Sequence, residues 1–375
     1  MTQRLAAALT SLDAALRFLL DGVTPVEPAN VSLAEAIGCF AAATEPLRDA
    51  YPPFSVAVSD GWALCARDIV GASSYSPVTL ASAPAWVEAG DRLPDRCDCV
   101  LDADMAEQIG PMFQVLAEVV PGHGIRRAGD DIGAERSIIV SGERIRSLDV
   151  LAARSTGFDS LQIRSPRVRV IDVTANDGKT ASSRFVLDFA RSIGAQATDV
   201  QTRGRDIASI SAAIGESACD LLVTVGGTGL GRTDMAIEAL VASGATLIHG
   251  LALQPGRTAA VGKIGTIPVI AAPGTPDQAL AVCLALVQPA LDFLTGRAPR
   301  CEIIRPLARK ISSAIGVTEV VLLEQSDESW MPIAAGQLSL EAMTRSDAWI
   351  AVPGDSEGYA AGTKAGALSL REKWD

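Results

Sequence analysis

The sequence predicts a multidomain α/β protein, and three observations support this class. Its 375 residues are more than twice the roughly 150 of a typical domain, so a single core is not expected. Apolar strands alternate with amphipathic helices from Arg167 to Gly296, which predicts a parallel sheet covered by helices on both faces. Residues 51–141 are instead rich in proline, glycine and short alternating runs such as 62–69 and 113–120, which are typical of a small β-rich domain.

Residues 1–50 predict a helical domain. An amphipathic helix is expected at the N-terminus rather than a signal sequence, because charged residues interrupt a set of leucines at helical spacing. These leucines are Leu5, Leu9, Leu12, Leu16 and Leu19. Ser32 and Glu35 have the spacing of a capping box ahead of a short helix. A helical pattern returns at 142–165, so the β-rich segment is predicted to be an insertion into this domain.

The α/β domain is predicted to span 166–298. Strands are expected at residues 168–173, 197–202, 221–225, 246–251 and 267–272, and helices at 183–193, 207–216, 235–242 and from 277 onward. Asp206 is expected to cap the second of these helices. Residues 299–375 predict a small C-terminal β domain with strands at 319–323 and 348–352.

Composition excludes several classes of function. The 32 Lys and Arg against 44 Asp and Glu give a net charge of −12, which argues against a general nucleic-acid or anionic membrane surface. The longest apolar run, 279–287, is far shorter than the roughly 18 residues that cross a bilayer, so no transmembrane helix is expected. Seven scattered cysteines are typical of a reduced, cytosolic protein. Two histidines supply neither a zinc cluster nor a His-dependent nucleophile.

A glycine-rich loop is the strongest candidate site. Residues 226–234 directly follow a predicted strand and precede a helix, so the backbone can approach an anion there. The pattern fits neither a Walker A loop nor a dinucleotide fingerprint. It therefore predicts phosphate binding, and the alternative is a turn in which Asp234 caps the next helix. The residues assigned to ligand binding are Gly226, Gly227, Thr228, Gly229 and Gly231.

Two further loops end strands of the same predicted sheet. Residues 273–277 open the long helix, with Thr275 as the N-cap and Pro276 at the first helical position. Because the carboxyl ends of parallel strands share one edge, this loop and the glycine-rich loop are expected to line one cleft from two sides. Arg257 is expected to add a cation there, and a solvated turn is the alternative. The ligand-binding residues assigned here are Pro273, Gly274, Thr275, Pro276 and Arg257.

The β-rich domain adds carboxylates and arginines. Asp60 lies in a turn that follows a proline-extended segment at 51–54. Residues 125–132 place Arg126 and Arg127 beside Asp130 and Asp131. Paired carboxylates can hold Mg²⁺ and arginines can hold phosphate, while a plain turn and a surface ion-pair cluster are the alternatives.

Taken in order, these segments resemble the molybdopterin molybdenumtransferase family, which includes MoeA and the gephyrin E domain. The resemblance extends over nearly the whole chain and rests on six ordered matches, which are more specific together than any one alone. They are Pro-Pro-Phe with an Asp-Gly turn (52–54, 60–62), Gly-x-x-Leu-Pro-x-x-x-Asp (90–98), Ile-Arg-Arg-x-Gly-Glu-Asp-Ile (125–132), Gly-Gly-x-x-x-Gly-x-x-Asp (226–234), Pro-Gly-Lys (255–257) and Pro-Gly-Asn-Pro (273–276).

The resemblance implies a fold and an assembly. It implies four domains, assigned to residues 1–50 plus 142–165, 51–141, 166–298 and 299–375. The third is a MogA/MoeA-like α/β sandwich that binds molybdopterin, and the fourth is a small β-barrel. It also implies a homodimer whose active cleft lies between the third domain of one subunit and the second domain of its partner. A molybdoenzyme or a MogA-like protein is a further expected partner. The protein is expected in the cytoplasm, and neither nucleic acid nor a membrane is expected to bind it.

The resemblance also implies a reaction. The family inserts molybdenum from molybdate into adenylylated molybdopterin and releases AMP, with Mg²⁺ assisting. By motif matching, Asp60, Asp131 and Asp234 correspond to catalytic carboxylates that also bind metal, and Asp177 is a fourth candidate metal ligand. Arg126 and Arg127 join the ligand-binding set, and Arg257 takes the place of a family lysine.

Several positions depart from the family pattern. Asn176 aligns with a glutamate, and Arg205 falls at an aspartate of an Arg-Asp-Asp motif, which leaves only Asp206. Gln254 replaces a lysine, and the loop after Asp177 is shortened. Such losses are expected to alter metal affinity and water activation before phosphate binding. Three hypotheses follow: a transferase of weakened activity, a non-catalytic molybdopterin-binding or scaffolding paralogue, and an enzyme for another phosphorylated ligand.

Overall fold

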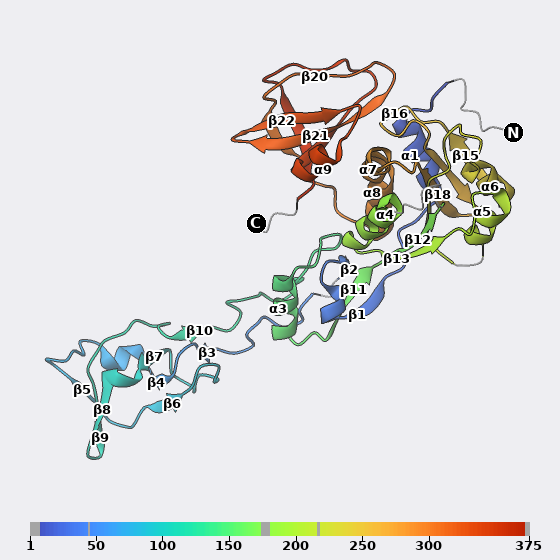
Figure 1. Ribbon diagram of the computed structural model, residues 1–375. Coiled ribbons are helices and arrows are strands. Elements are labelled where there is room, and N and C mark those ends of the chain that lie inside the picture. Colours follow the sequence, from blue (N-terminus) through green and yellow to red (C-terminus); the bar gives the residue numbers. More distant parts are fainter. Residues whose placement is uncertain (1–7, 44–45, 174–180, 216–217, 372–375) are drawn as a thin grey trace. The chain divides into compact units, whose positions relative to one another are not determined.

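The computed structural model of the chain describes residues 8–43, 46–173, 181–215 and 218–371 (Figure 1). The chain forms two compact units. The first comprises Met1–Ala43, Ile139–Leu151 and Asp159–Asp375, and the second comprises Thr44–Ile138 and Ala152–Phe158. The four-domain division remains a prediction from the sequence.

A mixed six-stranded sheet forms the core of the α/β part. Its strand order is β13-β12-β14-β18-β17-β15, in which β13, β12, β14 and β18 run parallel as predicted. The prediction of a wholly parallel sheet is wrong at β17, which pairs antiparallel with both neighbours. A two-residue turn at Gly265 and Thr266 joins β17 to β18 as a hairpin. The strands are β12 (Arg167–Asp172), β13 (Gln196–Gln201), β14 (Leu221–Val225), β15 (Ala245–His249), β17 (Ala260–Ile264) and β18 (Ile267–Ala272).

Helices cover both faces of this sheet. On one face, α1 (Leu12–Leu20), α4 (Ala181–Ser192) and the helix that begins with α7 (Pro276–Val282) pack in one apolar cluster with the strands. On the other face, α5 (Ile207–Ile214) and α6 (Ala236–Ala242) pack in a second cluster. Asp206 caps α5, as predicted, by accepting a hydrogen bond from the backbone N–H of Ser209 (2.9 Å).

The helix that begins at α7 is long and mostly buried. It continues through a π-helical turn (Cys283–Val287) into α8 (Gln288–Thr295). Within the described residues, Pro276–Thr295 is the one helix long and apolar enough to cross a membrane, with a mean hydropathy of 1.5, and 78% of it is buried inside the protein. Its packing against the sheet identifies it as a core helix of the α/β part.

The N-terminal region differs from the predicted helical domain. Helix α1 begins after its cap Ser11, so Leu9 precedes it, and Leu5 lies outside the described residues. The helix buries Leu12 and Leu19 against the α/β core. The predicted capping box is confirmed at Ser32 and Glu35. The rest is a three-stranded sheet, because the short segments around α2 pair with a strand more than 100 residues later in the chain. The elements are β1 (Ala29–Ser32), α2 (Leu33–Ala36), β2 (Phe40–Ala43), α3 (Ser147–Ser155) and the central strand β11 (Ser160–Arg164).

The C-terminal region is built on antiparallel strands. The predicted strands at 319–323 and 348–352 are present within β21 and β23. Its β21 also pairs with β16, which comes from the α/β part. The predicted barrel remains a prediction, and an isolated parallel bridge joins Leu307 to Trp330. The elements are β16 (Leu253–Gln254), β19 (Ile303–Pro306), β20 (Ile311–Ser312), β21 (Thr318–Ser326), β22 (Ser329–Ala335), α9 (Leu340–Arg345), β23 (Ala348–Val352), β24 (Gly358–Tyr359) and β25 (Lys364–Ser369).

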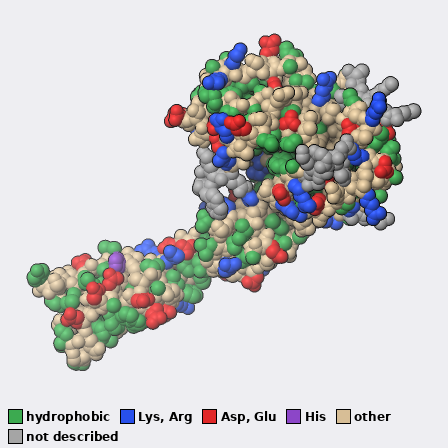
Figure 2. All heavy atoms as spheres, viewed as in Figure 1, with side chains coloured by type: hydrophobic (Ala, Val, Ile, Leu, Met, Phe, Trp, Pro, Cys, Tyr) green, Lys and Arg blue, Asp and Glu red, His purple; other side chains and the backbone are tan. Residues whose placement is uncertain are grey.

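The second unit contains short antiparallel strands in three small sheets, β6-β4-β7, β5-β9-β8 and β10-β3. The alternating runs at 62–69 and 113–120 are strands only in their first halves, and a 3₁₀ turn (Ala66–Ile69) follows the strand in the first run. Trp62 packs edge-on against Trp86 and Phe113, with ring centroids 5.0 and 4.9 Å apart. Figure 2 shows apolar side chains, in green, on the surface of this unit at the lower left. The strands are β3 (Val56–Ala57), β4 (Gly61–Leu64), β5 (Val78–Leu80), β6 (Ala85–Val87), β7 (Cys99–Asp102), β8 (Ala106–Ile109), β9 (Met112–Val115) and β10 (Ile125–Arg126).

Candidate functional site

The glycine-rich loop after β14 has a backbone that only glycine fits. Gly226 and Gly227 have φ values of +97° and +69°, which L side chains rarely adopt. A Cβ atom on Gly226 would lie 3.0 Å from the carbonyl oxygen of Val173, and one on Gly227 would lie 3.2 Å from a methyl group of the same valine. The loop therefore packs closely against the end of β12 and presents backbone rather than side chains.

The loop after β18 contacts the glycine-rich loop. The N–H of Gly226 donates to the carbonyl oxygen of Ala272 (2.8 Å), and a Cβ atom on Gly274 would lie 3.3 Å from the Cα of Gly226. Ser182 at the start of α4 donates a hydrogen bond to the carbonyl oxygen of Gly274 (2.7 Å). The sequence did not indicate this serine. The two loops thus meet at one edge of the sheet, as predicted.

The start of α7 adds backbone donors to the same edge. Thr275 is the N-cap residue and Pro276 lies in the first turn, as predicted, but the threonine hydroxyl makes no capping hydrogen bond. The first N–H groups of a helix have no partner within the helix and carry a partial positive charge. Together with the glycine-rich loop, they form an arrangement that suits a phosphate or another oxyanion.

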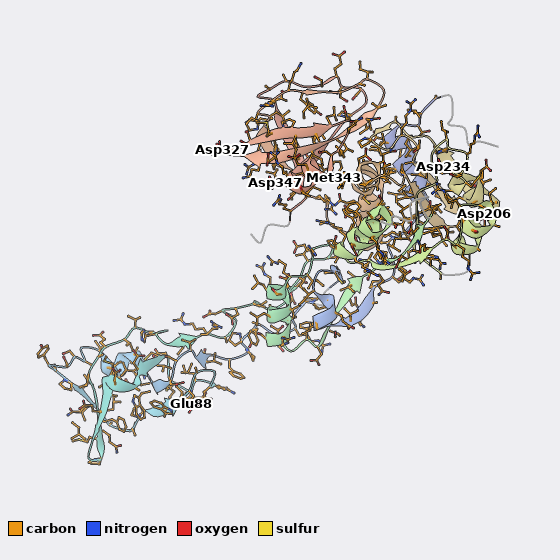
Figure 3. All side chains as sticks on the ribbon, viewed as in Figure 1. Glu88, Asp206, Asp234, Asp327, Met343 and Asp347 are labelled. Carbon is orange, nitrogen blue, oxygen red and sulfur yellow. The ribbon has the colours of Figure 1, made fainter. Side chains whose placement is uncertain are left out.

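Asp234 does not cap the following helix. The N-cap residue of α6 is Met235, which makes no side-chain capping bond. Asp234 instead accepts a hydrogen bond at Oδ2 from the N–H of Gly231 (3.0 Å) and at Oδ1 from Nη2 of Arg205 (2.7 Å). A Cβ atom on Gly229 would lie 2.6 Å from Oδ2, so the loop folds tightly around this carboxylate. Figure 3 shows Asp234 within the α/β part.

Thr228 is a structural member of the loop. Its side chain is almost fully buried, and its hydroxyl lies 3.3 Å from that of Thr258. Nε2 of His249 lies 3.1 Å from the carbonyl oxygen of Thr228. Burial lowers the pKa of His249, so the neutral ring donates this hydrogen bond. Thr228 therefore fixes the backbone of the glycine-rich loop through its contacts with Thr258 and His249.

Arg257 lies in the loop between β16 and β17. It is exposed, and its carbonyl oxygen accepts a hydrogen bond from the N–H of Leu251 (3.1 Å). Gln254 donates through Nε2 to the carbonyl oxygen of Gly336 (3.0 Å). Gln254 therefore binds the C-terminal region, and Arg257 remains the cation of this loop.

Asp172 is an acidic residue that the sequence did not single out. It ends β12, beside Val225 at the end of β14, and is only 7% exposed. Burial raises its pKa, while a hydrogen bond from Ser183 and the charge of Arg184 act in the opposite direction. The sequence contained one indication of this residue, because Asp172 is a carboxylate at the carboxyl end of a buried strand, where ligands of a parallel sheet bind.

Asp172→Asn is expected to change how stability depends on pH. The pKa of Asp172 is higher in the folded chain than in the unfolded chain. The protonated carboxyl therefore stabilises the fold below its ordinary pKa, and this contribution is lost as pH rises through the raised pKa of the folded state. The neutral amide of the variant avoids this loss. Its unfolding temperature, measured by circular dichroism, should be a few degrees higher than that of wild type at neutral pH and close to that of wild type around pH 4. Asp188→Asn, at an exposed position of α4, is the control, and equal shifts at both pH values would contradict the prediction.

The second unit brings three of the matched motifs together. Strand β3 pairs with β10, with Val56 opposite Arg126, and the N–H of Ala128 donates to Oγ of Ser55 (3.4 Å). The N–H of Leu93 donates to the carbonyl oxygen of Ser55 (2.9 Å). Segments 52–62, 90–98 and 125–132 therefore form one local cluster.

The predicted catalytic carboxylates of this unit make local contacts. Asp60 accepts a hydrogen bond at Oδ1 from the N–H of Ala89 (2.8 Å). Asp131 forms an ion pair with Arg126, with 3.1 Å between Oδ2 and Nη1. Within the described part of the chain, the side chain of Arg127 makes no hydrogen bond or ion pair. It lies next to Gly122, where an added Cβ atom would be 2.9 Å from its Nη2. These contacts leave the catalytic roles of Asp60 and Asp131 as predictions.

The described residues do not assemble a Mg²⁺ site. Across residues 8–43, 46–173, 181–215 and 218–371, no group of three histidine, cysteine, aspartate or glutamate side chains is placed to hold a metal ion. Asp234 already pairs with a guanidinium, and Asp177 lies outside the described residues, as does Asn176.

Two family models match most of the chain. One, described as "MoeA N-terminal region (domain I and II)", matches residues 10–157, and the other, described as "Probable molybdopterin binding domain", matches residues 159–292. The chain belongs to the MoeA family. Both loops of the candidate site, 226–234 and 273–276, lie within the second match.

Relatives in the MoeA family have low identity over most of the chain. A molybdopterin biosynthesis protein of Methanocaldococcus jannaschii is 25% identical over 341 residues, 83% of this chain and 84% of that protein. Molybdopterin molybdenumtransferase 2 of Mycobacterium tuberculosis is 23% identical over 319 residues, 75% of this chain and 78% of the relative. Two crystal structures of the molybdopterin biosynthesis MoeA protein from Pyrococcus horikoshii have a similar fold. One has a TM-score of 0.75 at 22% identity, and the match covers 97% of this chain and 100% of that one. The other has a TM-score of 0.71 at 21% identity, and the match covers 96% of this chain and 100% of that one. They share the α/β multidomain fold.

Proposed function

We propose that this chain acts in molybdenum cofactor biosynthesis as a molybdopterin molybdenumtransferase. It would insert molybdenum from molybdate into adenylylated molybdopterin and release AMP. The observation that carries the proposal is the contact between the glycine-rich loop and the loop at 273–276, which gives a MoeA-family chain an edge suited to an oxyanion. Relatives named molybdopterin molybdenumtransferase support the reaction.

The proposed roles follow from the charges involved. Molybdate and the phosphorylated pterin are both anions, and cleavage of the bond to AMP leaves negative charge on phosphate oxygens. Backbone N–H groups of the two loops would hold phosphate. Arg257 is exposed and precedes Thr258, which contacts Thr228 of the glycine-rich loop, and it would attract the anions. Arg126 and Arg127 are proposed to bind ligand from the second unit. Asp60, Asp131 and Asp234 are proposed as the carboxylates that orient the reacting groups.

A homodimer in the cytoplasm is part of the proposal. Leu148 and Leu151 of α3 are among the apolar side chains of the first unit that are more than half exposed. The two leucines are three residues apart and therefore lie on one face of their helix. A second copy of the chain is the proposed cover for this surface, because exposed apolar groups of this size favour burial in an interface.

The wild-type chain is expected to release AMP. Purified full-length protein would be incubated with adenylylated molybdopterin and molybdate, with and without Mg²⁺, and AMP would be quantified by chromatography. Heat-denatured protein is the control for spontaneous hydrolysis. Tight pterin binding with AMP release no faster than this control would overturn the proposal and favour the non-catalytic paralogue.

A further inference from the structure

Arg205 holds the carboxylate of Asp234 from a neighbouring loop. It lies in the turn between β13 and α5, and its Nη2 is 2.7 Å from Oδ1 of Asp234. Its Nε donates to the carbonyl oxygen of Thr233 (3.3 Å), so the guanidinium engages two consecutive residues. Both side chains of the ion pair are only 20% exposed, which makes the pair stronger than a typical surface salt bridge.

The other oxygen of the carboxylate shapes the glycine-rich loop. Oδ2 of Asp234 accepts from the N–H of Gly231, and Cβ atoms on Gly229 and Gly231 would lie only 2.6 and 2.8 Å from it. The turn at residues 229–234 is therefore wrapped around a carboxylate whose charge is balanced from outside the loop. The guanidinium of Arg205 supplies that balancing charge.

A divalent cation and this guanidinium would compete for the same carboxylate. A metal ion bound to Asp234 would lie within a few ångströms of the positive charge of Arg205, and like charges at such distances repel strongly in a partly buried site. The neighbouring cation Arg203 is exposed and forms no ion pair in the described part of the chain, so it does not replace Arg205.

We propose that Arg205 takes the place of a metal ion at Asp234. In this chain the ion pair holds the glycine-rich loop in its anion-binding form without a divalent cation at that carboxylate. Arg205 is thus a positioning residue, which acts through Asp234 and the loop. The inference deepens the proposed function and rests on it only for the identity of the anionic ligand.

Metal binding by the full chain tests the inference without pterin or molybdate. The probe is Mn²⁺, titrated into wild type, Arg205→Ala, Arg205→Ala/Asp234→Asn and the matched control Arg203→Ala, with free Mn²⁺ measured by electron paramagnetic resonance. Arg205→Ala is expected to bind Mn²⁺ at least about tenfold more tightly than wild type, equivalent to ~1.4 kcal/mol. The double variant should lose this gain, and Arg203→Ala should match wild type.

Two results would overturn the inference. One is unchanged Mn²⁺ affinity in Arg205→Ala that circular dichroism shows to be folded. The other, which needs no arginine variant, is a Mn²⁺ site in wild type that Asp234→Asn removes. Because neither measurement involves AMP release, a failure here is distinguishable from a failure of the proposed transferase activity.

Discussion

Gly226→Ala is expected to reduce AMP release by about a hundredfold, since displacement of a binding group by roughly 1 Å can cost that much. Alanine at φ +97° is strained by about 1–2 kcal/mol. Its Cβ would also lie 3.0 Å from the carbonyl oxygen of Val173, so the loop must move away from the end of β12. The same movement would separate it from Gly274 across the edge of the sheet. Steady-state kinetics and thermal unfolding would be measured together.

Gly244→Ala is the matched control. Gly244 also has a positive φ, +87°, but a Cβ atom there meets nothing within 4 Å. This variant should show a similar strain penalty and keep wild-type AMP release. If both variants lose stability equally and both keep activity, the close packing of the glycine-rich loop is not required for function.

Asp234→Ala is the second change with a large expected effect. It removes the acceptor of the Gly231 N–H and leaves the charge of Arg205 without its carboxylate partner. We expect AMP release to fall by about 10²–10³-fold, the scale seen when a preorganised polar group is lost from an active site. Stability should fall by about 1–3 kcal/mol, because a partly buried charge loses its partner. The measurements are kcat/KM and the unfolding free energy in urea.

Asp206→Ala separates this effect from ordinary loss of a helix cap. Asp206 caps α5 through Ser209 and lies one residue from Arg205, yet it contacts neither loop of the candidate site through its capping bonds. Its removal should cost about 1 kcal/mol and leave AMP release unchanged. Equal losses of activity in the two variants would indicate that charge near α5, rather than Asp234 itself, matters.

The central strands and their loops could be predicted because their signals are local. Strands β14 and β18 have the bounds that the sequence predicts, since a strand buried on both faces is an apolar run bounded by glycine or proline. Strand β17 was missed because Gly262 and Lys263 interrupt its apolar pattern. Strands β1 and β2 were missed because each has only four residues and depends on pairing with β11, which is distant in the chain.

The candidate site was predicted only in part. The glycine and proline residues of both loops were identified because these residue types restrict or free the backbone wherever they occur. The role of Asp234 as a helix cap was a wrong alternative, because the helix begins one residue later and the carboxylate turns back onto Gly231. Asp172, Ser182 and His249 were missed because their importance comes from neighbours on other elements.

The sequence by itself determined the class of this protein. It predicts an α/β sheet, a glycine-rich turn directly after the central strand β14, and a series of motifs shared with the MoeA family. Only the tertiary structure decided which charges meet. Arg205 and Asp234 are 29 residues apart in the chain and belong to different strand-to-helix loops. Residue patterns report burial and backbone freedom, which are local. The choice of an ionic partner depends on distances of a few ångströms between elements, and packing alone sets these distances.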